Sequence, residues 1–446
     1  MNFWIPPQVQ TALTLLEKGG WEAYLVGGCV RDTLLGQRPA DYDLCTSALP
    51  EEMVRCFADF PCIATGLRHG TLTVCIDGMN LEITTYRLDG SYSDSRHPDS
   101  VTFSSRLEED LARRDFTVNA MAYHPQRGLV DLYGGQKDLS ERLIRCVGEP
   151  ERRYHEDALR ILRAYRFVSK LDFALERQTG RWAHDLSERL AKVSRERIYG
   201  ELQGILCGAG AGRAILEMGP QVWGQVFPQD GGFPAGQYGS GSQTDRLCET
   251  AEAVGQAERD FSLRCALLLG LFYPPERMTV QSQREAAAQE LEMLLRGRCF
   301  PKERAEEIAA LFRFGGRPLL PERESLLRLL QEAGPGTVER LIGLQQALLC
   351  AKVRLHPSES DSETAQREEN LKKVRQRLIQ LLTGEKNACY TVGQLTVGGQ
   401  ELLEAGVLPG RPVGETLRWL LEAVITGRVE NRREDLLAYL SAGRQR

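Results

Sequence analysis

The spacing of apolar side chains divides the chain into an N-terminal part of mixed elements and a longer helical part. Before residue 139, short segments of helical spacing alternate with short apolar runs, whereas helical spacing dominates afterwards. We therefore predict an α+β fold, with a mixed-sheet head followed by all-helical domains. The predicted domain boundaries are 1–138, 139–215, 216–345 and 346–446.

Within the head, the pattern changes between helical and strand periods over short distances. It predicts helices over 8–19 and 30–35 and strands over 23–26, 41–45, 71–76 and 81–86. Asp77-Gly78 separates the last two strands, and this pair favours a tight hairpin turn.

The helical part contains three segments with long, regular spacing and two polar interruptions. Residues 151–171, 195–206 and 366–382 are each predicted to form one helix. Residues 229–245, rich in Gly, Ser and Pro, are predicted to be a loop, and 357–365 an exposed linker.

Composition indicates a soluble globular protein. The 446 residues are 42% hydrophobic and 26% charged, with a net charge of −5 that excludes a uniformly basic nucleic-acid coat. The longest apolar stretch, 261–272, contains Arg264 and is too short to cross a bilayer. The first residues also lack a basic segment followed by an apolar run, so we expect no membrane association and a cytoplasmic location.

Cysteines and histidines do not form a zinc pattern. The twelve cysteines include no C-x-x-C pair, and the six histidines show no ligand spacing. His155-Glu156 begins like a zincin motif, but Leu159 stands where H-E-x-x-H needs its second histidine. An added metal-dependent phosphohydrolase domain is therefore not expected.

Two closely spaced acids in the head indicate a site for Mg²⁺ rather than zinc. Asp41 and Asp43 are two residues apart in a predicted strand, so they would face the same side. Carboxylate oxygens suit Mg²⁺, and two such ions can promote phosphoryl transfer. Gly27-Gly28, between a strand and a helix, would let backbone N–H groups approach phosphates. Glu82, on a later strand, is a candidate third catalytic carboxylate.

Five motifs then occur in order over about 180 residues. They are LVGGCVRDTLLGQRPADYDLCTSA (25–48), DLARRDFTVNAMAY (110–123), DLYGG (131–135), EDALRILRAYRF (156–167) and SRERIYGEL (194–202). Together they resemble the motifs of class II tRNA nucleotidyltransferases, in the polymerase β superfamily. The segment 401–431 also resembles the tail of that family, whereas residues 215–390 match less clearly. The resemblance implies a head, neck, body and tail.

The resemblance assigns roles to residues at matching positions. Gly28 and Arg31 would contact the nucleotide phosphates, and Asp41 and Asp43 would hold the metal ions. The residues expected to hold the ribose and phosphates are Arg113, Arg114, Asp115 and Asn119.

The fourth motif would read the base. The resemblance places Asp157 and Arg160 at the base, with Arg163 and Arg166 supporting that site and the phosphates. At a spacing of three on a helix, Asp157 and Arg160 would be neighbours. The carboxylate could accept from an exocyclic amino group while the guanidinium donates to a ring nitrogen. Cytosine and adenine both offer that pair of groups, whereas uracil and guanine offer the reverse.

The implied activity is addition of CCA to the 3′ end of tRNA from CTP and ATP. The helical C-terminal part would clamp the acceptor arm. The polar segment 86–103, including Arg96, resembles the family loop associated with the change from C to A addition, which favours the full activity. Alternatives are a bacterial poly(A) polymerase, a partial CC- or A-adding enzyme, and a non-catalytic RNA-binding protein. Oligomeric state is left open.

Overall fold

The computed structural model describes residues 3–89, 101–227, 241–271, 280–356, 362–383 and 388–443. The chain divides into two compact units, Met1–Tyr238 and Gly239–Arg446, which are described separately. The finer division into head, neck, body and tail at residues 138, 215 and 345 stays a prediction.

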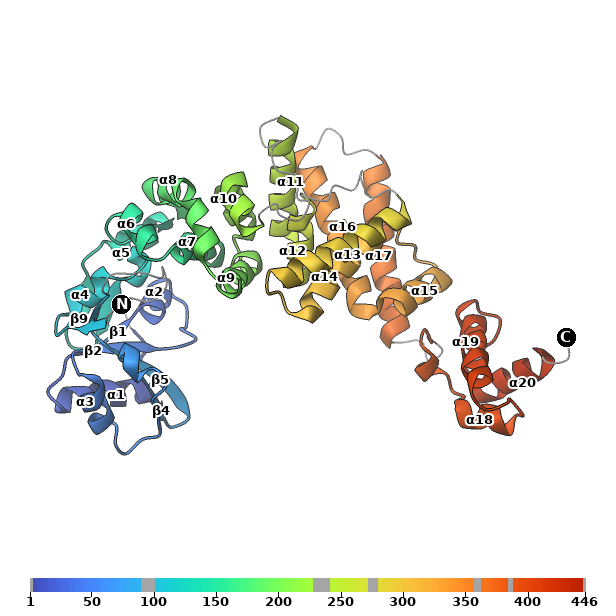
Figure 1. The fold of residues 1–446 in the computed structure, drawn as a ribbon, viewed down its shortest axis with the longest axis horizontal. Helices are drawn as coiled ribbons and strands as arrows, with labels where there is room; N and C mark the ends of the chain where they lie inside the picture. Colours follow the sequence, from blue (N-terminus) through green and yellow to red (C-terminus); the bar gives the residue numbers. More distant parts are fainter. Residues whose placement is uncertain are drawn as a thin grey trace. The chain divides into compact units, whose positions relative to one another are not determined.

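The first unit is built on a seven-stranded sheet with the order β3-β4-β5-β2-β1-β8-β9 (Figure 1). The strands are β1 (Ala23–Val26), β2 (Asp43–Thr46), β3 (Cys62–Ile63), β4 (Thr71–Ile76), β5 (Met79–Thr85), β8 (Met121–His124) and β9 (Gly128–Asp131). All neighbours are antiparallel except β2 and β5, which run parallel. This confirms the predicted mixed sheet.

The β4–β5 hairpin follows from its sequence. Leu72, Val74 and Ile76 alternate with more exposed residues along β4 and are buried, as a strand with one core face requires. Asp77 and Gly78 have φ values of 46° and 80°, the left-handed pair that closes a two-residue hairpin. β4 therefore matches the predicted strand 71–76, and β5 overlaps the predicted strand 81–86 but begins two residues earlier and ends one residue earlier.

Helices and two short strands complete the head. They are α1 (Pro7–Lys18), α2 (Gly28–Leu34), α3 (Pro50–Cys56), η1 (Leu67–His69), α4 (Leu107–Ala112), η2 (Thr117–Asn119), α5 (Gly135–Glu141), β6 (Arg87–Asp89) and β7 (Val101–Phe103). The interpretation of 86–103 as one loop is wrong at its ends, because β6 and β7 pair antiparallel there. Arg96 lies outside the described residues.

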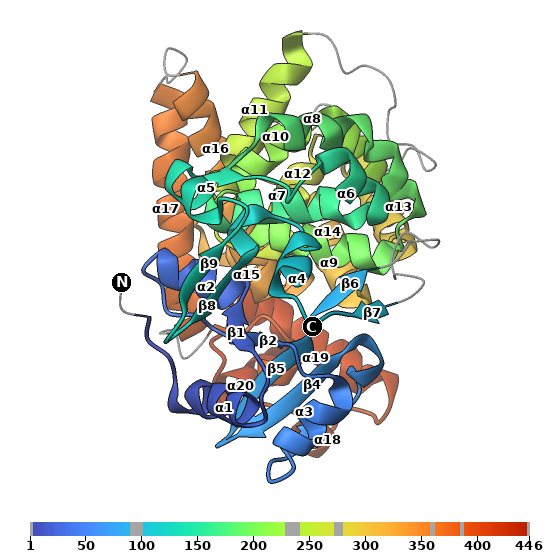
Figure 2. The same ribbon diagram turned by 90° about the vertical axis from the view of Figure 1, so that its left-hand side faces the viewer.

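A helical layer follows the sheet in the same unit (Figure 2). It contains β10 (Leu143–Ile144), α6 (Pro150–Glu156), α7 (Leu159–Leu171), β11 (Ala174–Leu175), α8 (Arg177–Asp185), η3 (Ser187–Lys192), α9 (Arg195–Cys207) and α10 (Ala211–Val226). The predicted single helix over 151–171 is wrong, because Asp157 is extended at φ −143° and ψ 108°. Its Oδ1 accepts the Leu159 N–H at 2.9 Å, so it ends α6 and supports the start of α7.

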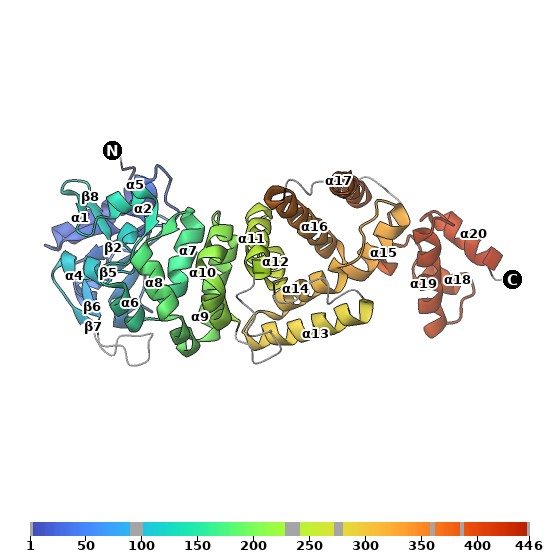
Figure 3. The same cartoon turned by 90° about the horizontal axis from the view of Figure 1, so that it is seen from above.

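The second unit is helical throughout its described residues (Figure 3). Its elements are α11 (Gly241–Gln256), α12 (Phe261–Leu269), α13 (Gln281–Gly297), α14 (Lys302–Gly315), α15 (Arg323–Ala333), α16 (Pro335–Leu355), α17 (Ser362–Thr383), η6 (Val392–Gln394), α18 (Gly399–Glu404), α19 (Arg411–Ile425) and α20 (Arg433–Gly443). The predicted helix over 366–382 is confirmed within α17. The predicted loop 229–245 is wrong at its end, where α11 begins, and 228–240 lie outside the described residues.

The apolar stretch around residue 264 is a buried helix of the second unit. Arg264 in α12 is only 2% exposed, and it donates to the carbonyl oxygens of Ala257 and Glu258 at 2.7 and 3.0 Å. These bonds explain how a charge is accommodated in an apolar run. In the part of the chain that the structure describes, every helix is too short or too polar to cross a bilayer.

Candidate active site

A glycine turn joins β1 to α2 at the edge of the site. Gly27 has φ 72° and ψ −127°, a conformation that L side chains rarely adopt. A Cβ built on Gly27 would lie 3.3 Å from Nη1 of Arg114, so its absence gives the arginine close access to the turn. The first and second motifs therefore meet here.

Three carboxylates meet next to this turn. Asp43 is the first residue of β2, and Glu82 is its register partner in the parallel strand β5. Aligned residues in neighbouring strands lie on the same face of a sheet. Asp41 lies two residues before β2 begins, so the prediction that it belongs to the strand is wrong. The sheet nevertheless brings the three predicted acids into one region.

The acids influence one another electrostatically. Burial, followed by the charges of Asp41 and Glu82, raises the pKa of Asp43 to about 6, while Arg114 acts in the opposite direction. A divalent cation would relieve this repulsion, and oxygen ligands suit a hard cation. Among the described residues, no group of three or more His, Cys, Asp or Glu side chains is already arranged around a metal position. The assignment of a divalent-cation site to these acids therefore rests on the suitability of carboxylate oxygens as ligands.

A buried acid organises the second motif. Asp110 is fully buried, and its Oδ1 accepts from Nε and Nη2 of Arg113 at 3.0 and 2.7 Å. Its Oδ2 accepts from Nη2 of Arg114 at 3.0 Å. Burial alone would raise the pKa of Asp110, but the two arginines outweigh it and lower the pKa. The sequence interpretation missed this residue, although its spacing of three and four from the arginines was a signal.

The remaining residues of that motif reach the first and fourth motifs. Asp115 Oδ2 accepts from Nε and Nη2 of Arg163 at 2.9 and 2.5 Å. Burial opposes ionisation of Asp115, but Arg163 outweighs it and lowers the pKa. Asn119 accepts at Oδ1 from Nη1 of buried Arg31 at 2.5 Å. Residues separated by dozens of positions are thus held in one network.

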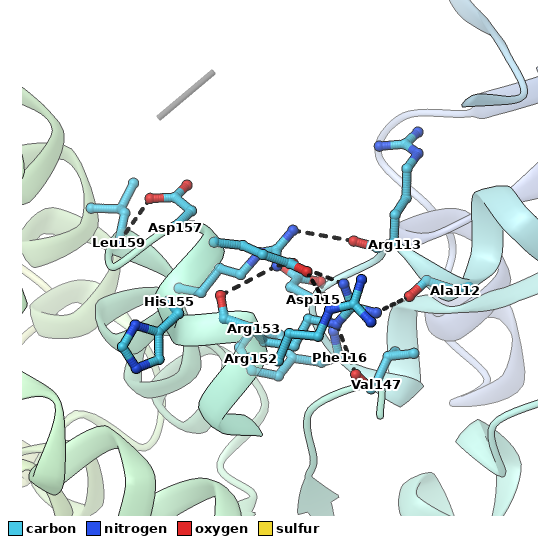
Figure 4. Close-up of polar contacts among 12 residues, drawn as sticks. Ala112, Arg113, Asp115, Phe116, Val147, Arg152, Arg153, His155, Asp157 and Leu159 are labelled. Atoms are coloured by element: carbon cyan, nitrogen blue, oxygen red, sulfur yellow. Dashed lines mark hydrogen bonds and ion pairs between the residues drawn. The ribbon is translucent and has the colours of Figure 1, made fainter. Parts of the chain in front are cut away.

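Asp157 is fixed at both of its oxygens, and Figure 4 shows the bond to Leu159 at one of them. Besides capping Leu159, it accepts at Oδ2 from Nη2 of Arg197 at 2.8 Å. The prediction that Asp157 and Arg160 lie in one helix is wrong, because Asp157 is extended. The two residues are still neighbours, because the Arg160 N–H donates to the Asp157 carbonyl at 3.0 Å within a single turn.

The Arg160 guanidinium is held from several sides. Its Nη1 donates to Glu156 Oε2 at 2.5 Å and to the Arg153 carbonyl at 3.3 Å, and its Nη2 donates to the Arg113 carbonyl at 3.2 Å. Glu156 also accepts from Nη1 of Arg153 at 2.8 Å. Figure 4 shows Arg153 reaching the carbonyls of Ala112 and Val147. Arg197 was missed as a site residue because its partner Asp157 lies 40 positions away, whereas Glu156 and Arg153 were missed although the spacings of three and four around Glu156 were a signal.

The structure therefore gathers the candidate residues into two adjoining groups. The acid group contains Asp41, Asp43, Glu82, Arg114 and the glycine turn. The second group combines the arginines of α2 and α7 with the second motif through Arg31–Asn119 and Arg163–Asp115. Such a combination of a cation site and an anion site suits transfer of a nucleotide.

Three family models match successive parts of the chain. Residues 23–145 match the Poly A polymerase head domain, and 172–219 match the probable RNA and SrmB-binding site of polymerase A. Residues 343–440 match the putative tRNA nucleotidyltransferase domain 2. The matches span both units.

Three relatives illustrate the similarity, and two of them cover nearly the whole chain. The CCA-adding enzyme of Lactobacillus delbrueckii subsp. bulgaricus is 34% identical over 439 residues, 97% of each chain. That of Lactobacillus helveticus is 52% identical over 189 residues, 42% of this chain and 47% of the relative. The crystal structure of the Bacillus stearothermophilus CCA-adding enzyme in complex with CTP has a TM-score of 0.71 at 30% identity, covering 99% of this chain and 98% of its own. The chain therefore belongs to the CCA-adding enzymes, a family of tRNA nucleotidyltransferases.

Proposed function

We propose that this protein adds C, C and A to the 3′ end of tRNA, using CTP and ATP and releasing pyrophosphate. The observation that carries the proposal is the placement of Asp41 and Asp43 beside a network that ends in Asp157 and Arg160. Similarity to CCA-adding enzymes over 97% of the chain supports the same reaction. Poly(A) polymerase is less favoured, because the relatives matched over almost the full length add CCA.

Asp41 and Asp43 would hold Mg²⁺, with Glu82 adding negative charge from the neighbouring strand. When bound, Mg²⁺ makes the tRNA 3′-hydroxyl a better nucleophile toward the α-phosphate and offsets charge on the leaving pyrophosphate. The predicted role of the protein is to align the hydroxyl, the α-phosphate and the leaving group before reaction, because alignment lowers the entropic part of the barrier.

The arginines would receive the triphosphate, whose negative charge they complement. Arg31, Arg163 and Arg166 converge from α2 and α7, and Gly28 begins α2 beside Arg31. Asp115 and Asn119 fix two of these arginines, which leaves them pre-positioned. The proposed ribose contacts are made by the residues of the second motif: Arg113, Arg114, Asp115 and Asn119.

Base choice would rest on the fixed side chains of the fourth motif. A carboxylate has more acceptor positions than the two that Leu159 and Arg197 occupy, so Asp157 can still accept from an exocyclic amino group. Arg160 can donate to the adjacent ring nitrogen of cytosine or adenine. Uracil and guanine would present a carbonyl to Asp157 and an N–H to Arg160, which leaves polar groups unpaired.

The helices after residue 139, including those of the second unit, are proposed to hold the tRNA acceptor arm. Such binding would use the shape and phosphates of the RNA duplex. The cytoplasmic location predicted from the sequence agrees with tRNA as substrate and stays a prediction.

Incorporation of each labelled NTP with Mg²⁺ tests the proposal on three RNAs: tRNA lacking CCA, tRNA ending in CC, and an unstructured RNA. We expect C, C and A on the first, A on the second and little on the third. Long A tracts on all three would favour poly(A) polymerase, and arrest at CC would favour a partial enzyme. No incorporation would contradict catalysis altogether.

A further inference from the structure

The ring of Phe167 lies beside three guanidinium groups. Its centroid is 5.6 Å from Cζ of Arg31, 5.9 Å from that of Arg163 and 5.2 Å from that of Arg166. Arg31 belongs to α2, whereas the other two arginines and Phe167 itself belong to α7. The ring is therefore the point at which the arginines of the first and fourth motifs converge.

Each of these guanidinium groups also has an acidic partner. The ion pairs are Arg31–Asp32 at 2.7 Å, Arg163–Asp115 at 2.5 Å and Arg166–Glu201 at 2.9 Å. The acids come from three different parts of the chain, and none of them joins two of the three arginines in these pairs. Phe167 is thus a contact that all three arginines of this cluster (Arg31, Arg163 and Arg166) share.

Arg166 is the least satisfied member. Its Nε lies 2.9 Å from Glu201 Oε2, yet neither buried atom has a hydrogen-bond partner of suitable geometry among the described residues. Burial, together with the charges of Arg163 and Arg31, lowers the pKa of Arg166. The Arg166 guanidinium is therefore incompletely satisfied, and a bound anionic group would stabilise it.

We propose that Phe167 is a positioning residue for the nucleotide triphosphate, an inference that rests on the proposed function. An aromatic face attracts guanidinium groups, and the attraction increases when they are partly desolvated. A carboxylate in place of the Phe167 ring would accept hydrogen bonds from the N–H groups of the three arginines and neutralise their charge. The ring instead holds Arg31, Arg163 and Arg166 together without adding an acceptor that would compete with phosphate oxygens for their remaining N–H groups.

Phe167 is only 6% exposed, as an ordinary core residue would be. A neighbouring aromatic residue provides a matched control for that role. Phe116 is fully buried, and its ring packs edge-on against Phe167 at 5.5 Å with an interplanar angle of 69°. Among the described residues, no cation–π contact is found for Phe116, so the two rings share packing but differ in their contacts with arginine.

The test compares Phe167→Leu with Phe167→Tyr and Phe116→Leu in the full-length protein. Binding of inorganic tripolyphosphate is measured by calorimetry, and KM and kcat for CTP are measured on tRNA lacking CCA. For Phe167→Leu we expect tripolyphosphate binding and KM to weaken about 10-fold, equivalent to about 1.4 kcal/mol. We expect a smaller change in kcat and an unchanged preference for CTP over UTP. Phe167→Tyr should restore binding.

Phe116→Leu should lower the thermal midpoint about as much as Phe167→Leu, while tripolyphosphate binding stays within about 2-fold of the unmodified protein. Equal weakening by both leucine variants, or wild-type binding by Phe167→Leu, would overturn the proposal. The calorimetric measurement needs no turnover. Normal tripolyphosphate binding without CCA addition would therefore refute the proposed function alone.

Discussion

The two units use charged residues in different ways. In the first unit, Asp110 is fully buried and Asp115 is nearly so, and both bind arginines from other motifs or turns. In the second unit, charge pairs such as Arg411–Glu415 lie one helical turn apart, with side chains 88% and 53% exposed. Both arrangements are ion pairs, but only the first removes the charges from water.

This difference indicates where individual charges matter. Burying an ion costs several kcal/mol unless it is well paired, whereas an exposed pair contributes about 0–1 kcal/mol. In the first unit, the use that we propose for the buried pairs is to orient the nucleotide site. Buried Arg264 in the second unit instead donates to backbone carbonyls, as a structural residue would.

The largest effect is expected from Asp43→Asn, which keeps the size of the side chain but removes its charge. Transfer from CTP should fall at least about 1000-fold, equivalent to about 4 kcal/mol, because metal binding would be lost. The rate is measured by single-turnover addition at saturating nucleotide, and tRNA affinity by filter binding. Activity of Asp43→Asn near that of the unmodified protein would contradict the metal assignment. Arg411→Ala, which removes one side chain of the exposed pair Arg411–Glu415, serves as the control.

Asp115→Asn should destabilise the protein by about 3 kcal/mol at pH 7, because it leaves Arg163 without its charged partner. The folded-state pKa of Asp115 lies below the ordinary value of 3.8 for an aspartate, so its contribution to stability is present above about pH 4 and is lost as pH falls through the folded pKa. Urea unfolding at several pH values should show the two proteins converging in stability at low pH. A difference that is constant with pH would contradict this explanation.

Arg197→Ala is expected to have a moderate effect on base choice. Arg197 donates to Asp157 at 2.8 Å and so restricts the carboxylate that is proposed to read the base. Its removal should reduce the preference for CTP over UTP about 10-fold, or about 1.4 kcal/mol. The measurement is competitive incorporation on tRNA lacking CCA. Slower transfer with an unchanged nucleotide preference would show that Arg197 does not act through Asp157.

The smallest effect is expected for the exposed pair Arg411–Glu415. A double-mutant cycle with alanine should give an interaction energy of about 0.5 kcal/mol or less. Urea unfolding at low and high salt measures it, and salt should reduce it further. An interaction energy above about 2 kcal/mol would contradict the difference drawn between the exposed pairs of the second unit and the buried pairs of the first.

The head could be predicted in part from sequence, where local signals agree with packing. Periodicity and the Asp77-Gly78 turn located β1, β4 and most of β5, and the strand predicted over 41–45 overlaps β2, whereas β3, β8 and β9 were not predicted. The predicted helix over 151–171 failed because helical spacing continues through Asp157, and the break depends on a side-chain hydrogen bond that periodicity cannot show.

The candidate site was predictable in part for a similar reason. Chemically distinctive residues such as Asp41 and Asp43 belong to motifs that the sequence displays directly. Other site residues are oriented by partners that lie far away along the chain. Arg197 lies 40 positions from its partner Asp157, and Arg163 lies 48 positions from its partner Asp115. Sequence spacing contains no information about such pairs, so Arg197 and the arrangement around Phe167 required the fold.

The most direct test of the account is the nucleotide preference of Asp157→Ala on tRNA lacking CCA. Incorporation of CTP against UTP is measured in competition for this variant and for the unmodified protein. If Asp157 and Arg160 read the base, the preference should fall about 10- to 100-fold, as expected for loss of one specific base contact. An unchanged exclusion of UTP would contradict base reading by these two side chains.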